Sequence, residues 1–281
     1  MLSGVGVSLR PPFEAYVHNW DQVSWLEVLI DNFLMRSSDA LSRLRPYAEL
    51  YPLAFHSVSL SVGDFLVKRP SPFLRQLRRA VCEYQPTVVS DHVCWSSYGG
   101  CYVHDLLPLP RTPTELERLV ERVDYIQEFL GVPLILENIT AYAAYEVDCM
   151  SEGEFFTELT QRTGCGVLLD LHNLWVNARN WGSDSMQDLL AMPLHAVKQV
   201  HVAGGEMRGQ LCVDSHSSRV SDDILALFGE LCMRCGPTPV CLEWDREIPD
   251  PKILETELQR IANVLQRYSH GKNSSLARTV S

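Results

Sequence analysis

Eight short apolar runs, three to six residues long, recur along the chain and constrain its fold more than any other feature. Runs of this kind are typical of strands that are buried on both faces, as in a parallel sheet. The predicted strands cover residues 5–9, 25–30, 53–55, 87–89, 133–136, 166–169, 197–202 and 239–242.

Segments with helical spacing or helix-capping residues separate these runs. Thr112, Pro113 and Glu115 form a helix start, and Ser151 with Glu154 forms a capping box. The predicted helices cover residues 13–20, 37–50, 72–84, 113–129, 151–162, 185–190, 221–232 and 253–268. Strands that alternate with helices predict a parallel sheet, and eight such units predict a (β/α)8 TIM barrel.

An open, doubly wound sheet is the alternative fold. It is disfavoured because no glycine-rich phosphate loop follows the first apolar run. We therefore expect a single barrel domain over residues 1–270 and a polar, disordered tail over residues 271–281.

Composition excludes several classes of protein. The formal net charge of -11 argues against a surface that binds nucleic acid, which needs clustered basic residues. No apolar run approaches the roughly 20 residues needed to span a bilayer, so we expect no membrane association. The 9 cysteines are scattered without a disulfide framework, and no secretion signal is evident, which predicts a cytoplasmic protein with reduced thiols.

Six of the eight predicted strands end in imidazole or carboxylate side chains. In a barrel these ends meet at the C-terminal mouth, where barrel active sites lie. One buried carboxylate, such as Glu137 alone, would more often have a structural partner. So many together would repel one another or lack partners unless cations compensate them. Imidazole and carboxylate ligands suit iron, manganese or zinc.

The candidate metal ligands are enough for two or three ions, because catalytic sites commonly use three protein ligands per ion. Glu137 and Glu243 are the natural ligands for two ions to share. The predicted ligands are His56, His92, Glu137, Asp170, Asn173, His201, Asp214, His216 and Glu243. The residues predicted to be catalytic are His56, His92, Glu137, Asp170, His201 and Glu243.

Three neighbouring residues are interpreted differently. Asp91 is expected to orient His92, and Asn138 to orient Glu137. His172 would point away from Asp170 if the strand continued through it, so it is left out of the ligand set. Two other classes of protein remain possible: a barrel hydrolase or isomerase that uses zinc, manganese or magnesium, and a scaffold that only binds a peptide or a partner.

Eight ordered motifs extend the argument beyond single residues. They are Phe55-His56-Ser57-Val58-Ser59-Leu60-Ser61, Ser90-Asp91-His92, Leu107-Pro108-Leu109-Pro110, Leu136-Glu137-Asn138, Leu168-Leu169-Asp170-Leu171-His172-Asn173, His201-Val202-Ala203-Gly204, Asp214-Ser215-His216 and Glu243-Trp244-Asp245. With these motifs the chain resembles the multinuclear non-heme iron-dependent oxidases, from about residue 4 to residue 268.

The resemblance implies an iron-bound barrel that uses O2 to oxidise a cysteine of a ribosomally made peptide. It also implies a heterodimer with a small partner protein that recognises the peptide leader. Two or three non-heme irons are implied, at least one of them ferrous. The implied ligand sets are His56, His92 and Glu137; then Glu137, Asp170, His201 and Glu243; then Asn173, Asp214 and His216.

Within that family the chain looks most like the oxidase of thiaglutamate biosynthesis, which excises the β-carbon of a C-terminal cysteine. The alternative is the methanobactin type of chemistry, which converts a cysteine into an oxazolone and a thioamide.

Overall fold

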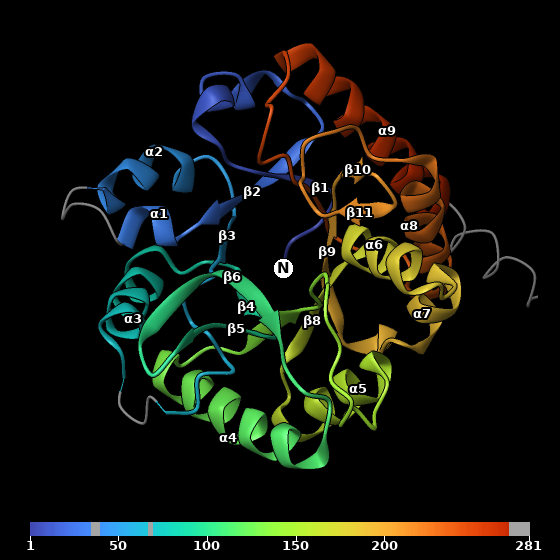
Figure 1. The fold of residues 1–281 in the computed structure, drawn as a ribbon. Helices are drawn as coiled ribbons and strands as arrows, with labels where there is room; N and C mark the ends of the chain where they lie inside the picture. The colour runs from blue at the N-terminus through green and yellow to red at the C-terminus, as the bar shows by residue number, and fades with distance from the viewer. Residues whose placement is uncertain (35–39, 67–69, 270–281) are drawn as a thin grey trace, which may run out of the picture.

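A closed barrel of eight parallel strands forms the centre of the molecule in a computed structural model that describes residues 1–34, 40–66 and 70–269 (Figure 1). Around the barrel the strand order is β1, β12, β9, β8, β7, β4, β3 and β2. The strands are β1 (Val5–Ser8), β2 (Val23–Leu29), β3 (Leu53–His56), β4 (Val88–His92), β7 (Leu134–Glu137), β8 (Gly166–Asp170), β9 (Val197–Val202) and β12 (Val240–Leu242). The predicted TIM barrel is confirmed, and the open sheet is excluded.

Helices surround the barrel in Figure 1 and cover its outer face. They are α1 (Asp31–Leu34), α2 (Arg45–Ala48), α3 (Pro72–Tyr84), α4 (Pro113–Leu130), α5 (Glu152–Thr163), α6 (Leu171–Trp181), α7 (Ser185–Ala191), α8 (Asp222–Cys235) and α9 (Pro251–Ser269). Thr112 caps α4 as predicted, and Ser151 with Glu154 forms the predicted capping box of α5. Within the described ranges, no helix is both long enough and apolar enough to cross a bilayer.

Two predicted helices differ from the structure, and two helices were not predicted. Residues 13–20 contain only short 3-10 turns, part of one at Pro11–Phe13 and one at Val17–Asn19. Residues 35–39 and the predicted tail 271–281 lie outside the described residues, and the rest of the predicted helix 37–50 is a 3-10 turn followed by the short α2. The helices without a predicted counterpart are the short α1, which follows β2, and α6, which directly follows β8.

Two hairpins lie between the predicted strands and helices, where the sequence predicted neither. β5 (Cys94–Tyr98) pairs with β6 (Cys101–Pro108), and β10 (Glu206–Arg208) pairs with β11 (Leu211–Val213). The turn signal for the first is Gly99-Gly100, where both glycines have positive φ. These strands are short, and they show no sustained alternation of apolar and polar residues. Their signal in the sequence was therefore weak.

The barrel interior has an apolar floor below a polar layer. Trp25, Ala54 and Cys241 form a buried cluster with Leu2, separate from the main core between strands and helices. Alternate residues on a strand share a face. The side chains two positions further along the chain therefore also point inward: Glu27 of β2, His56 of β3 and Glu243, which directly follows β12. The polar layer therefore lies above the apolar floor, at the carboxyl ends of the strands.

Gly6 of β1 is expected to be required for this floor. A Cβ on Gly6 would lie 2.4 Å from ring atoms of Trp25, which is fully buried. Overpacking of this kind costs about 1–3 kcal/mol. Gly6→Ala should therefore lower the free energy of unfolding measured in urea.

The matched control is Gly229→Ala in α8. Its Cβ would come no closer than 3.2 Å to another atom, the Tyr268 hydroxyl, and alanine favours a helix by about 1 kcal/mol over glycine. The control should leave stability unchanged or raise it. Equal stability of the two variants would contradict the packing argument.

Candidate metal centre

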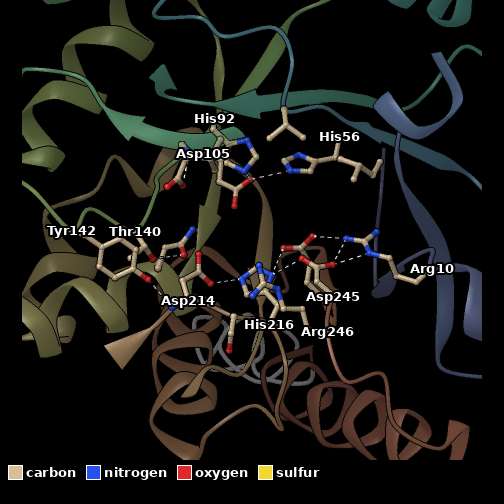
Figure 2. Close-up of a pocket in the computed structure, with 17 residues that line it drawn as sticks. Arg10, His56, His92, Asp105, Thr140, Tyr142, Asp214, His216, Asp245 and Arg246 are labelled. Atoms are coloured by element: carbon tan, nitrogen blue, oxygen red, sulfur yellow. Dashed lines mark hydrogen bonds and ion pairs between the residues drawn. The ribbon is translucent and has the colours of Figure 1, made fainter. Parts of the chain in front are cut away.

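A cavity of about 270 Å³ opens at the carboxyl ends of the barrel strands (Figure 2). Strand ends supply part of its lining, including His56, His92 and Glu137. The loop after β11 supplies Asp214 and His216. Of the predicted ligands, those that line the cavity are His56, His92, Glu137, Asn173, Asp214, His216 and Glu243.

A first group of side chains consists of His56, His92 and Glu137. Oxygen Oε2 of Glu137 lies 3.5 Å from Nε2 of His56 and 3.3 Å from Nε2 of His92. Two ligands that are each about 2.1 Å from one ion lie roughly 3.0–3.5 Å apart. The group therefore has the spacing of one metal site.

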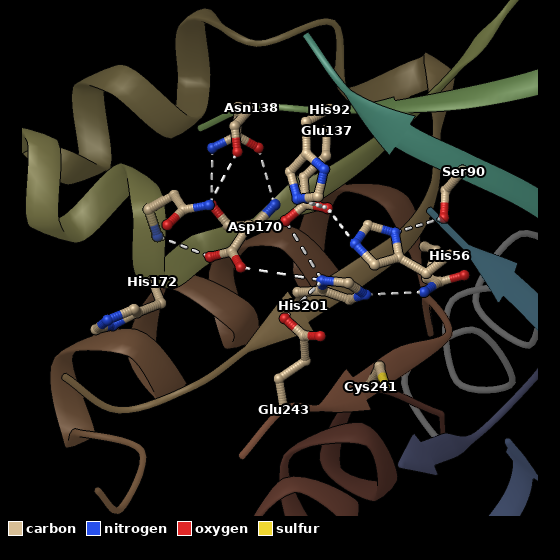
Figure 3. A network of polar contacts seen from close by, with 12 residues as sticks. His56, Ser90, His92, Glu137, Asn138, Asp170, His172, His201, Cys241 and Glu243 are labelled. Atoms are coloured by element: carbon tan, nitrogen blue, oxygen red, sulfur yellow. Dashed lines mark hydrogen bonds and ion pairs between the residues drawn. The ribbon is translucent and has the colours of Figure 1, made fainter. Parts of the chain in front are cut away.

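A second group shares Glu137 with the first (Figure 3). Here the other oxygen, Oε1 of Glu137, lies 3.4 Å from Nδ1 of His201. The same His201 nitrogen lies 3.1 Å from Oε2 of Glu243 and 4.0 Å from Oδ2 of Asp170. The two oxygens of Glu137 thus face different groups of candidate ligands, as they would in a carboxylate that bridges two ions.

A third group contains His172, which sequence reasoning left out. Oδ1 of Asp214 lies 2.8 Å from Nε2 of His216 and 3.5 Å from Nε2 of His172. The strand does not continue through His172, because β8 ends at Asp170 and α6 begins at Leu171. The side chain of Asp170 accepts a hydrogen bond from the backbone N–H of Asn173 and caps the N-terminus of this helix. Asp170 is a residue type that often caps a helix N-terminus, and this was the sequence signal that could have placed His172 in the first turn of a helix.

Asn173 and Asn138 have structural contacts. Asn173 lines the cavity, but its amide donates to the carbonyl of Asn138, and its Oδ1 accepts from Thr140. The Asn138 amide hydrogen-bonds with the backbone N–H and carbonyl of Asp170. Asn138 therefore joins the ends of β7 and β8, and the prediction that it orients Glu137 is not what the contacts show.

Three imidazoles have a partner at their second ring nitrogen, the one that does not contact Glu137 or Asp214. Nδ1 of His56 contacts the Ser90 hydroxyl at 2.8 Å. Nε2 of His201 contacts Glu27 at 2.8 Å, and Nδ1 of His216 contacts Asp245 at 3.2 Å. Such partners orient an imidazole and set which nitrogen carries a free lone pair.

Glu27 and Asp245 were not among the predicted site residues. Glu27 had a detectable signal, because it is a carboxylate inside the apolar run 25–30. Asp245 also binds Arg10 through two nitrogens of the guanidinium, which connects the N-terminal strand to the centre (Figure 2).

Asp91 is buried next to His92 without belonging to any of the three groups. Its Oδ1 lies 3.7 Å from Nδ1 of His92, and its Oδ2 accepts hydrogen bonds from the Ser57 hydroxyl and the Leu60 amide. The separation from His92 is longer than a hydrogen bond, so the orienting role stays a prediction, and the contacts of Oδ2 anchor the loop that follows β3.

Burial and nearby charges strongly shift the pKa values of several side chains in these groups. Burial and the charge of Glu137 raise the pKa of Asp170 well above its usual value. Burial alone would raise the pKa of Glu243, but His201 and His216 hold it well below its usual value. Burial and the charge of His216 lower the pKa of His172 to about 4, so this imidazole is neutral at pH 7.

The donor atoms fit metal ions better than they fit each other. Several buried atoms make no hydrogen bond of suitable geometry with the residues described, even where another candidate ligand is close, and they converge on the three groups. They include Glu137 Oε2, Asp170 Oδ2, His172 Nε2, His201 Nδ1, Asp214 Oδ1 and His216 Nε2. Unsatisfied buried polar atoms are costly, and cations would satisfy them. Clustered histidines and carboxylates of this kind could bind metal ions.

Solved structures with a similar fold include sugar epimerases. D-psicose 3-epimerase from Clostridium cellulolyticum H10 has a TM-score of 0.61 at 12% identity, over 95% of this chain and 99% of that chain. L-ribulose 3-epimerase has a TM-score of 0.60 at 14% identity, over 99% of both chains. At such low identity these similarities establish the barrel and nothing about the reaction.

Proteins related in sequence match this chain at higher identity than the solved structures do. The chain is 37% identical over 266 residues to a UPF0276 protein of Anaeromyxobacter sp. (strain Fw109-5), covering 94% of this chain and 93% of that protein. It is 38% identical over 267 residues to a UPF0276 protein of Chromobacterium violaceum, covering 94% and 96%. The family described as RiPP precursor modification enzyme MbnB/TglH/ChrH, which acts on ribosomally synthesised and post-translationally modified peptides, matches residues 4–266. The chain therefore belongs to the MbnB/TglH/ChrH family of RiPP precursor modification enzymes.

Proposed function

We propose that this enzyme is an iron- and O2-dependent oxidase that modifies a cysteine of a ribosomally synthesised peptide. The proposal rests on membership of the peptide-modifying family together with the three groups of imidazoles and carboxylates at the barrel mouth. Imidazole and carboxylate ligands with no thiolate are well suited to non-heme iron. A zinc, manganese or magnesium hydrolase or isomerase is the competing proposal, and metal analysis separates the two.

One observation carries the proposal furthest. Glu137 directs one oxygen toward His56 and His92 and the other toward His201. Glu137 would therefore help to hold two metal ions, and such a pair would supply binding positions for a substrate and for O2. His216, Asp214 and His172 would hold a third ion in the same cavity.

Iron bound here would deprotonate a substrate thiol that coordinates it and would activate O2. The chain itself supplies orientation, because buried partners hold His56, His201 and His216 from behind. The loop residues Tyr142 and Arg246 line the open side of the cavity, where a peptide would enter (Figure 2).

For the reaction we propose excision of the β-carbon of a C-terminal cysteine, as in TglH. The Cα–Cβ and Cβ–S bonds break, a Cα–S bond forms, and the lost CH2 with one O2 balances as formic acid. The alternative is the oxazolone and thioamide chemistry, in which four hydrogens and one O2 leave as two waters.

We further propose a peptide substrate that a small leader-binding partner protein presents, in a heterodimer with this enzyme. A cytoplasmic location is part of the proposal, since none of the cysteines, which all lie in the described part of the chain, forms a disulfide.

Glu137→Ala should lower iron binding at two groups, because it removes a ligand that both share. His92→Ala should weaken one group only. Iron per protein after anaerobic reconstitution measures the difference, and Glu257→Gln, a buried carboxylate on α9 that pairs with Arg219 and Arg260, is the control. Equal iron content in the Glu137 and His92 variants would contradict the shared role.

His172→Ala should release the iron of the third group more readily. Its imidazole faces Asp214, whereas the amide of Asn173 is engaged by Asn138 and Thr140. Iron loss during dialysis against a chelator measures this, with Asn173→Ala as the comparison. Faster loss from the Asn173 variant, with none from the His172 variant, would restore the ligand set expected from the sequence.

A peptide that ends in cysteine should lose one CH2 when it is incubated with the enzyme, its partner protein, ferrous iron and O2. Mass spectrometry distinguishes this product from one that has lost four hydrogens. The same peptide with serine in place of the cysteine, and the same reaction without O2, should show no change. Full turnover with zinc under anaerobic conditions would support the hydrolase or isomerase instead.

A further inference from the structure

A carboxylate lies inside the barrel below the candidate metal centre and does not line its cavity. Glu27 of β2 is fully buried, with 0% of its surface exposed. It points inward from the apolar run 25–30, two residues after Trp25 of the barrel floor. A buried carboxylate in such a place is costly unless specific contacts compensate it.

The contacts of Glu27 are made with two neighbouring inward side chains of β9 and one of β12. Oε2 lies 2.8 Å from Nε2 of His201 and accepts a hydrogen bond of 2.5 Å from the side-chain amide of Gln199. Oε1 lies 3.7 Å from Sγ of Cys241. These contacts come from residues far apart in the sequence, so the barrel has to be closed before they form.

The contact determines which nitrogen of His201 carries a proton. A carboxylate can only accept, so the 2.8 Å contact requires a proton on Nε2 of His201. The Gln199 amide is also a donor and lies 3.1 Å from the same nitrogen, so it cannot replace Glu27 as the acceptor there. The lone pair of a neutral His201 is then on Nδ1, which faces Glu137 and Glu243.

We propose that Glu27 is a positioning residue, which holds His201 in the orientation and tautomer that let Nδ1 bind a metal ion. The inference rests on the proposed metal centre and deepens it. Partners behind a metal-binding histidine typically contribute 10–100-fold to metal affinity, because they fix the ring and increase its basicity. His201 is the imidazole of the second group, which also contains Glu137, Asp170 and Glu243. Glu27 therefore acts on the group that lies next to both of the others.

A rival reading places a separate metal ion between Glu27, His201 and Cys241, whose donor atoms are close together. It requires a lone pair on Nε2 of His201, where the contact with Glu27 needs a proton. It also requires Cys241 as a ligand, whereas positioning through His201 does not involve the thiol.

The test uses two substitutions of Glu27 that differ in what they retain. Glu27→Leu removes the acceptor and the charge, and Glu27→Gln keeps an acceptor oxygen without the charge. Affinity for Fe2+ is measured anaerobically by competition with a chelator. We expect Glu27→Leu to bind Fe2+ about 10–100-fold more weakly than the wild type, with Glu27→Gln between the two.

Thermal unfolding of the metal-free variants, measured beside Fe2+ affinity, separates positioning from a structural role. Removing one partner of a buried contact leaves the other unpaired, so Glu27→Leu is expected to lower the Tm of the metal-free protein in either case. Positioning predicts, in addition, weaker Fe2+ binding by Glu27→Leu at a temperature well below that Tm, where the variant is folded. A lowered Tm with Fe2+ affinity equal to that of the wild type would overturn the inference.

Cys241→Ala and Glu257→Gln complete the set. Both should keep the Fe2+ affinity of the wild type, and a loss in Cys241→Ala as large as that in Glu27→Leu would overturn positioning in favour of the rival site. Failure of the wild type to bind Fe2+ would overturn the proposed function together with the inference. Tight binding by both the wild type and Glu27→Leu would overturn the inference alone.

Discussion

The buried carboxylate of Glu137, placed between imidazoles from three other strands, is the interaction on which the centre depends. Its side chain is almost fully buried, and each of its oxygens faces a different group of candidate ligands. Burial alone would raise the pKa of Glu137, but the imidazoles of His92 and His201 hold it below its usual value. The surrounding barrel has to keep these rings within a few ångströms, since their separation would leave an uncompensated buried charge.

Strand register achieves this arrangement. His92 of β4 is paired with Glu137 of β7, and Asp170 of β8 is paired with His201 of β9. Parallel neighbours in register end at the same level, so their last inward side chains form one ring around the barrel mouth. The apolar floor of Trp25, Ala54 and Cys241 fills the interior below that ring and excludes water from beneath it. Separate, short apolar runs in the sequence thereby become one polar site.

The pattern of strands and capped helices was predictable because apolar runs and capping residues are local signals. The polar strand ends followed from it, since a barrel brings such ends together. His172 could not be placed from alternation, because its side chain is directed by the first turn of α6 rather than by a strand. Glu27 was missed for the opposite reason: its strand was predicted, but its partners Gln199 and His201 become neighbours only through closure of the barrel. Contacts between residues that are far apart in the sequence are the hardest to predict from a single sequence.

The balance of charge in the cavity bears on the proposed reaction. Asp214, Glu243 and Asp245 surround His216, and the only guanidinium ion-paired to Glu243 or Asp245 in the described chain is that of Arg10. Although burial lowers the pKa of His216, the charge of Asp214 holds it well above its usual value, so protons compete with metal ions for this site. A substrate thiolate would be repelled by the same carboxylates. In the proposed reaction, metal ions held by these residues would offset the carboxylates and would favour the deprotonated form of a substrate thiol.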